Sequence, residues 1–330
     1  MYQPMMDLAG EVCFRPNFFQ TKKRINYLID RYLSYEVLCD RLEDLPQQFS
    51  NPQPRQWSTI KWEDIHPAQV IGLELDIFLS ILKGALDTEA PTRDYTQTSR
   101  QYLEPIHPSM AKFVGGMVDE NEAIVELGLW EKEERQHTPA LTKLYQQLGG
   151  QKITPSAKKA KCYQAWSNPY QDLYKHGLHR VMTEYGAACV YLWLMSHTTG
   201  TTQQVLGELL QDEINHLTKF WGMGMWLYPD GVKHLIRYLL SQIHTILPVS
   251  YETTIKSQAN ITSTFQRMMS VLNWQAWSIL HQGELIYTFI WILKRMGNWS
   301  SQRLLQSIYT RAVRPQNFLG TIGLNLINPK

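Results

Sequence analysis

The apolar residues of the chain recur with a helical period. Long segments place them three and four positions apart, whereas runs that alternate apolar and polar residues are hard to find. Clusters of glycine and proline separate these segments. The pattern predicts an all-α protein. Helices are expected over residues 22–42, 67–88, 119–147, 168–196 and 201–226, with two or three more within 232–330.

Residues that start or stop helices support these boundaries. Gly149 and Gly150 are a usual C-terminal signal, and Thr201 and Thr202 can cap the helix that follows them. Pro229 opens a Pro-Asp-Gly turn. The order of elements indicates one domain in three parts. These are a helical N-terminal extension (1–66), a central helical bundle (67–235) and C-terminal helices packed on it (236–330).

The composition narrows the class of protein. Of 330 residues, 19% are charged, against about 25% in typical soluble domains, while 44% are apolar. Such a chain can bury a large core, which excludes a disordered or fibrous protein. The net charge of +2 is too small for a nucleic-acid binder that relies on phosphate neutralisation, so no nucleic-acid partner is expected.

Cysteine spacing and hydropathy predict a cytoplasmic protein. Cys13, Cys39, Cys162 and Cys189 lie far apart without a CxxC spacing, which fits neither a disulfide framework nor a zinc ribbon. The N-terminal residues lack a basic segment followed by an apolar one. No apolar run approaches the roughly 18 residues that a transmembrane segment needs.

Glutamate and histidine recur three positions apart, a spacing that places both on one face of a helix. The spacing occurs four times: Glu63/His66, Glu104/His107, Glu134/His137 and Glu213/His216. Pro67 follows the first pair directly, and Pro105 lies inside the second, so neither is expected in a regular helix. The other two pairs lie in the middle of predicted helices.

Both remaining pairs lie on apolar faces. Glu134 and His137 share a face with Leu127, Trp130, Leu141 and Leu144, whereas Glu131, Glu133, Arg135 and Gln136 are expected to point elsewhere. Glu213 and His216 are flanked by Leu206, Leu209, Leu210, Leu217 and Phe220. No lysine or arginine lies on either face. A buried, unpaired carboxylate costs several kcal/mol, so these acids require protonation, a cationic partner or a metal ion.

Glu184 is a further candidate, on the helix between the two pairs. It shares a face with Val181, Ala188, Tyr191 and Met195. Antiparallel helices bring together residues that are equally far from their connection. Glu184 and Glu213 lie about 14 and about 12 residues from the turn at 197–201, which puts them at nearly one level.

Two Glu-x-x-His helices with single glutamates from two others match the carboxylate-bridged dinuclear metal site of ferritin-like four-helix bundles. The alternative is a set of buried acids that accept hydrogen bonds from tyrosine, tryptophan or threonine side chains. The constellation therefore predicts such a bundle, with additional N- and C-terminal helices.

Over residues 65–235 the chain resembles the soluble acyl-(acyl carrier protein) desaturases, a family of dinuclear iron enzymes. Its Trp-x-x-Glu-Glu-x-x-His motif corresponds to Trp130, Glu133, Glu134 and His137. Its Asp-Glu-x-x-His motif corresponds to Asp212, Glu213 and His216, followed by the turn at Pro229. Asn168-Pro169-Tyr170 is similar to the family's Ser-Pro-Tyr before the single glutamate Glu184.

The resemblance also proposes a ligand from the helix over 67–88. Gly84, Thr88, Glu89 and Tyr95 match the family's spacing, so Glu89 is favoured. Glu74, which lies within the apolar segment itself, remains the alternative.

The resemblance implies a site and a reaction. Two iron ions (Fe2+/Fe3+) would be held by Glu89, Glu134, His137, Glu184, Glu213 and His216, with O2 as co-substrate. Asp212 and Tyr185 would orient the histidines. The implied substrate is an apolar or acyl-carrier-linked chain, and the implied electron donor is of the ferredoxin type.

Ala187 departs from the family, which has threonine there, near where oxygen binds. The segment between Glu89 and Glu134 is also longer than usual. Hydroxylation or N-oxygenation of a non-lipid small molecule is therefore an alternative, as is a non-catalytic iron-binding protein.

Three further features are ambiguous. His176 and His179 are three apart but have no third metal ligand nearby in sequence. The aromatic-rich segment 268–296 favours core packing or a homodimer face over an acyl pocket or membrane contact. Lys158, Lys159 and Lys161, with Arg180, are either a solvated face or a docking surface for an acidic carrier protein.

Overall fold

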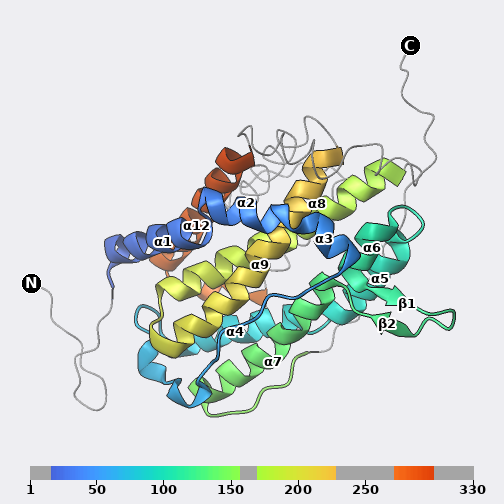
Figure 1. The fold of residues 1–330 in the computed structure, drawn as a ribbon. Coiled ribbons are helices and arrows are strands. Elements are labelled where there is room, and N and C mark those ends of the chain that lie inside the picture. Colours follow the sequence, from blue (N-terminus) through green and yellow to red (C-terminus); the bar gives the residue numbers. More distant parts are fainter. Residues whose placement is uncertain (1–15, 157–168, 228–270, 301–330) are drawn as a thin grey trace, which may run out of the picture.

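The computed structural model describes residues 16–156, 169–227 and 271–300, and most of them are helical (Figure 1). The α-helices are α1 (Phe18–Tyr32), α2 (Tyr35–Glu43), α3 (Leu45–Ser50), α4 (Leu75–Glu89), α5 (Thr92–Leu103), α6 (Pro108–Gly115), α7 (Leu129–Gly149), α8 (Pro169–Ser196), α9 (Gly200–Leu227) and α12 (Ile279–Ser300). Short 3-10 helices are η1 (Trp62–Asp64), η2 (Pro67–Gln69) and η3 (Trp274–Ala276). The predominance of helix confirms the prediction.

The expected helix over 22–42 is two helices. Leu33 ends α1, and Ser34 is extended and begins α2 by accepting a hydrogen bond from the Val37 amide at 3.3 Å. Asn17 and Gln20 form a capping box at the start of α1. A local cap therefore overrides the continuous apolar period.

Two other predicted helices begin later than expected. Residues 67–69 form only η2, and α4 begins at Leu75. The expected start of α7 at 119 is wrong, because β1 (Met117–Val118) and β2 (Ile124–Glu126) form a hairpin before Leu129. Gly116 ends α6 directly before β1 with φ +82, and a Cβ there would lie 1.8 Å from the Glu126 carbonyl oxygen of β2.

The end of α7 and both ends of α8 and α9 lie close to the predicted boundaries, whereas α5 and α6 occupy a segment where no helix was predicted. Gly150 ends α7 in the left-handed conformation, with φ +66. The expected threonine caps of α9 differ. The helix begins at Gly200, and Gln69 caps its first turn by accepting from the Thr202 amide at 2.9 Å and hydroxyl at 2.7 Å.

The helices pack in pairs, most extensively α8 with α9, α5 with α6 and α4 with α7 (Figure 1). The short connection 197–199 makes α8 and α9 antiparallel neighbours, and α7 packs on both α4 and α9. Every residue from 188 to 198 is buried, so α8 is covered on all sides at this end. On its outer side lie α1 and α12.

Part of the C-terminal region is also packed on this core. Trp277 stacks on Trp193 of α8 with ring centroids 4.7 Å apart, which matches the expected core packing of segment 268–296 where it is described. The helices expected at 232–270 and after residue 300 lie outside the described residues, as do Lys158, Lys159 and Lys161.

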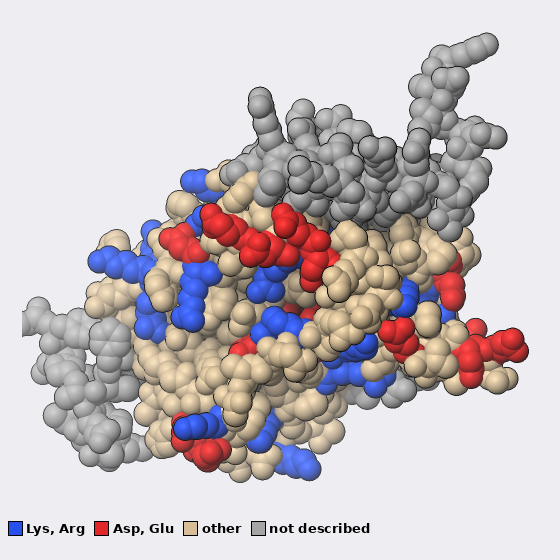
Figure 2. Space-filling view, viewed as in Figure 1, with Lys and Arg blue, Asp and Glu red and all other residues tan. Residues whose placement is uncertain are grey.

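On the face seen in Figure 2, the charged side chains lie in small groups. In Figure 2, acidic and basic side chains are interspersed among larger uncharged areas. None of the described helices combines the length and apolarity needed to span a membrane.

Candidate metal centre

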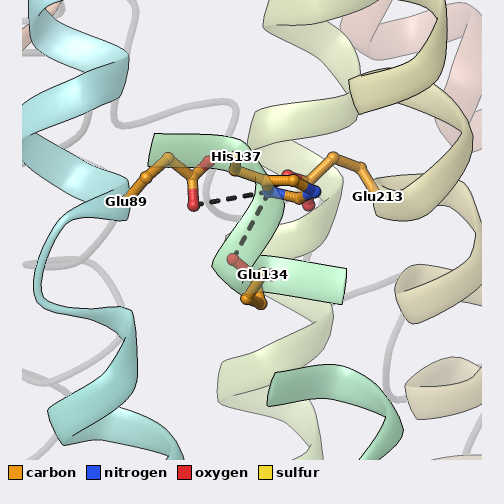
Figure 3. A group of neighbouring side chains, drawn as sticks. All are labelled: Glu89, Glu134, His137 and Glu213. Atoms are coloured by element: carbon orange, nitrogen blue, oxygen red, sulfur yellow. Dashed lines mark ion pairs between the residues drawn. The ribbon is translucent and has the colours of Figure 1, made fainter. Parts of the chain in front are cut away.

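Six side chains from four helices converge in the interior. Potential ligand atoms of Glu89, Glu134, His137 and Glu213 lie within 4.8 Å of one another (Figure 3). The same holds for a second group: Glu134, Glu184, Glu213 and His216. All these residues are buried, and Glu134 and Glu213 belong to both groups.

Helix geometry explains the convergence. On α7 and α9, glutamate and histidine are three residues apart and so share one face. On α8 and α9, Glu184 and Glu213 are equally far from the 197–199 connection, as the sequence indicated. The antiparallel packing therefore places them side by side.

The structure brings Glu89, and not Glu74, to this cluster. Glu89 is the last residue of α4, and α5 begins three residues later. Glu74 precedes the first residue of the same helix and is exposed. At 1.5 Å per residue the two ends of α4 are about 20 Å apart.

One nitrogen of each histidine faces the carboxylates. His137 Nδ1 lies 3.3 Å from Glu213 Oε1, 3.4 Å from Glu134 Oε2 and 3.7 Å from Glu89 Oε2. His216 Nδ1 lies 3.2 Å from Glu184 and 3.3 Å from Glu134. Within the described part of the chain, no lysine or arginine forms an ion pair with these four glutamates.

The other nitrogen of each histidine is held by an acid from the opposite helix. His137 Nε2 lies 3.3 Å from Asp212 on α9, and His216 Nε2 lies 2.8 Å from Glu133 on α7. Each of these acids immediately precedes a glutamate of the cluster. The arrangement is reciprocal, because each Glu-x-x-His helix orients the histidine of the other.

Glu133 was expected to point away from the apolar face, and this is wrong. It is fully buried and also accepts hydrogen bonds from Asn215 Nδ2 at 3.0 Å and the Arg55 amide at 2.8 Å. Tyr185, expected beside the histidines, instead donates to the Phe289 carbonyl at 2.6 Å. The signal for Glu133 was present in the sequence, since an acid precedes the glutamate in both motifs.

A network from the segment between α3 and η1 surrounds Asp212. Arg55 Nε donates to Asp212 Oδ1 at 2.8 Å, and its Nη1 pairs with Glu208 at 2.5 Å. Trp57 donates to Asp212 Oδ2 at 2.7 Å. Sequence reasoning missed these residues because they lie in an irregular, proline-bearing segment with no periodic pattern.

Neutral donors also contact the glutamates. Trp130 Nε1 donates to Glu134, the Tyr191 hydroxyl to Glu89 and the Thr183 hydroxyl to Glu184, each at 2.9 Å. The alternative of acids satisfied by such donors is thus partly realised. Among the described residues, however, each of these carboxylates gains only one such donor, and Glu213 Oε1 has no hydrogen-bond partner.

Crowding of acids perturbs the pKa values. Burial and the charge of Glu134 raise the pKa of Glu89 to about 7. Burial and Glu89 raise the pKa of Glu213 well above its usual range. Burial acts against ionisation of Glu134 as well, but His137 and His216 outweigh it and hold that pKa well below the usual range. The cluster therefore carries more negative potential than its two histidines can balance.

The other sequence candidates do not join this cluster. Glu104 ends α5 and His107 caps α6, so that pair spans two helices. Glu63 lies within η1 and His66 caps η2. His176 is buried and stacks on Tyr102. Ala187 packs against the hydrophobic core.

Comparison with protein-family models, curated proteins and solved structures gives no significant match to this chain.

Proposed function

We propose that α4, α7, α8 and α9 form a ferritin-like bundle that holds two iron ions, and that the protein is an O2-dependent oxidoreductase of the desaturase type. The observation that carries the proposal is the overlap of the two ligand groups. Glu134 and Glu213 belong to both, as bridging carboxylates would, and each group has one histidine.

The donor atoms fit two metal ions. His137 Nδ1 and Glu213 Oε1 are buried and have no hydrogen-bond partner in the described part of the chain, which costs about 1–3 kcal/mol for each group that stays unsatisfied. A bound cation would satisfy both atoms. Asp212 and Glu133 hold the outer histidine nitrogens, which directs each Nδ1 toward the carboxylates. A carboxylate-rich set with imidazole and no thiolate suits iron or manganese better than structural zinc.

Iron bound here would supply the electrons that reduce O2. The residues of the chain would hold and orient the ions, and the buried surroundings would exclude water from the reacting carbon. The proposed substrate is an apolar or acyl-carrier-linked molecule with an unactivated C–H bond, and a ferredoxin-type donor would return the electrons.

Hydroxylation or N-oxygenation of another small molecule is the second candidate. It is kept because Ala187 offers no hydroxyl where the desaturases have a threonine.

Metal analysis tests the site. The purified protein, reconstituted with Fe2+ under argon, should contain two ions per chain, and Glu134→Gln and Glu213→Gln should each lower this content. Glu63→Gln, which removes an exposed glutamate of the same Glu-x-x-His spacing, is the matched control and should retain both ions. A wild-type protein with only trace transition metal would overturn the proposal.

Oxygen consumption tests the reaction. Uptake should require both a reductant and an apolar substrate, because the proposed chemistry couples O2 reduction to C–H oxidation. Uptake that depends on neither would contradict the oxidoreductase and indicate iron storage or sensing.

A further inference from the structure

Arg180 lies on α8, one helical turn before Glu184, and its side chain is partly exposed although its Nε atom is buried. Nε has no hydrogen-bond partner among the described residues. No carboxylate of the described residues lies within 4.0 Å of the Arg180 guanidinium. The nearby Glu134 and Glu184 form their ion pairs with histidines instead. Burial lowers the pKa of Arg180, and the charge of Glu184 opposes this shift. The described residues thus leave this partly buried cation without a counter-ion, and a ligand could supply one.

The guanidinium lies next to the candidate metal centre. Its central carbon is 4.9 Å from the ring centroid of Trp130 and 5.9 Å from that of Tyr95. The indole N–H of Trp130 donates to Glu134. One indole ring therefore separates Arg180 from a ligand glutamate, and an anion on Arg180 would lie close to the ions.

The charges around Arg180 favour a single negative charge on the ligand. Two divalent ions would balance the four glutamates of the centre, leaving the charge of Arg180 uncompensated. His176 and His179 precede it on α8, but burial lowers the pKa of His176 well below its usual range and that of His179 to about 4. Both rings are neutral at pH 7, so one positive charge remains.

We propose that Arg180 binds the carboxylate of the substrate, which is thus an apolar carboxylic acid in its free, ionised form. The planar guanidinium offers two parallel N–H donors that match a carboxylate, and one unpaired charge suits a monoanion better than a phosphate dianion. The inference rests on the proposed function. It specifies that the substrate is a free acid rather than the neutral thioester of a carrier-linked chain.

Binding of octanoate and octanamide, measured by titration calorimetry under argon at pH 7.5 on protein of known iron content, tests the inference. The two probes share a chain but differ in charge. Octanoate should bind at least tenfold more tightly than octanamide. Arg180→Gln should weaken octanoate binding about 10- to 100-fold, the range for a charge-assisted hydrogen bond, and leave octanamide unchanged. Arg31→Gln, which removes an exposed arginine from α1, should change neither affinity.

Arg180→Lys keeps the charge without the planar fork and should bind octanoate with intermediate affinity, which covers the case in which Arg180→Gln does not fold. Equal affinities for the two probes would overturn the inference, as would unchanged octanoate binding by Arg180→Gln, because the carboxylate would then bind elsewhere. The proposed function fails separately, on the iron content.

Discussion

The variant Asp212→Asn tests whether Asp212 orients His137 for metal binding, apart from its contribution to the stability of the fold. The carboxylate is fully buried and meets Arg55, Trp57 and His137, three groups that can each donate a hydrogen bond. An asparagine has one acceptor oxygen. Its NH2 group must therefore face either Arg55 or the pair of Trp57 and His137.

The structure sets the expected magnitudes. Hydrogen bonds to charged groups contribute about 1.5–3 kcal/mol each, so the loss of one and the weakening of another should lower the free energy of unfolding by about 2–4 kcal/mol. The histidine also loses the acid that orients it. Loss of such a partner typically weakens metal binding about 10- to 100-fold.

Glu208→Gln is the matched control. Glu208 is buried, pairs with the same Arg55 and accepts from the Ser58 hydroxyl at 2.5 Å, but no contact between it and either histidine is observed among the described residues. Urea unfolding followed by circular dichroism should give similar losses of stability for both variants. Competition with a chelator should show weaker metal binding for Asp212→Asn alone. Equal metal affinities in the two variants would refute the orienting role.

Three further outcomes are expected. The neutral His107 ring accepts a hydrogen bond from the Met110 amide, and burial lowers the pKa of His107 to about 4. Between pH 6.5 and 4 the unfolded chain therefore binds the proton more readily, so the free energy of unfolding decreases as the pH is lowered. Urea unfolding at pH 7 and 4 should show the wild type losing about 3 kcal/mol more than His107→Asn, which caps α6 without titrating; equal losses would contradict the neutral ring. Gly116→Ala should lower the free energy of unfolding by more than about 2 kcal/mol, since its Cβ would meet the Glu126 carbonyl at positive φ, whereas Gly283→Ala, with nothing within 4 Å, should not destabilise. Removal of bound metal by a chelator should lower the melting temperature of the wild type but not of Glu213→Gln, and equal shifts would indicate that the metal binds elsewhere.

The helices and the cluster were largely predictable because they follow from local periodicity and fixed helix geometry. Glu184 and Glu213 meet because a short connection makes their helices antiparallel and each residue advances the helix by a constant rise. The preference for Glu89 over Glu74 came from the resemblance to the desaturase family rather than from the local pattern, and the structure places Glu89 in the cluster.

The remaining features depend on contacts that no period encodes. Arg55 and Trp57 reach α9 from an irregular segment more than 150 positions away in the chain. The hairpin before α7 requires the close approach of the Gly116 backbone to that of Glu126, which no apolar alternation signals. Tyr185 lies on the face of α8 that meets α12, a neighbour whose position the sequence did not supply.

The crossed pairing of Asp212 with His137 and of Glu133 with His216 bears on how this centre could be transferred to another protein. A single Glu-x-x-His helix grafted into a new scaffold would carry an acid whose target is absent and a histidine with no acid to direct it. The smallest portable part is therefore the pair of helices α7 and α9 in their mutual register. A sequence change on one helix is then tolerated only when it preserves the acid–histidine contact with the other helix. The two segments are therefore expected to vary together.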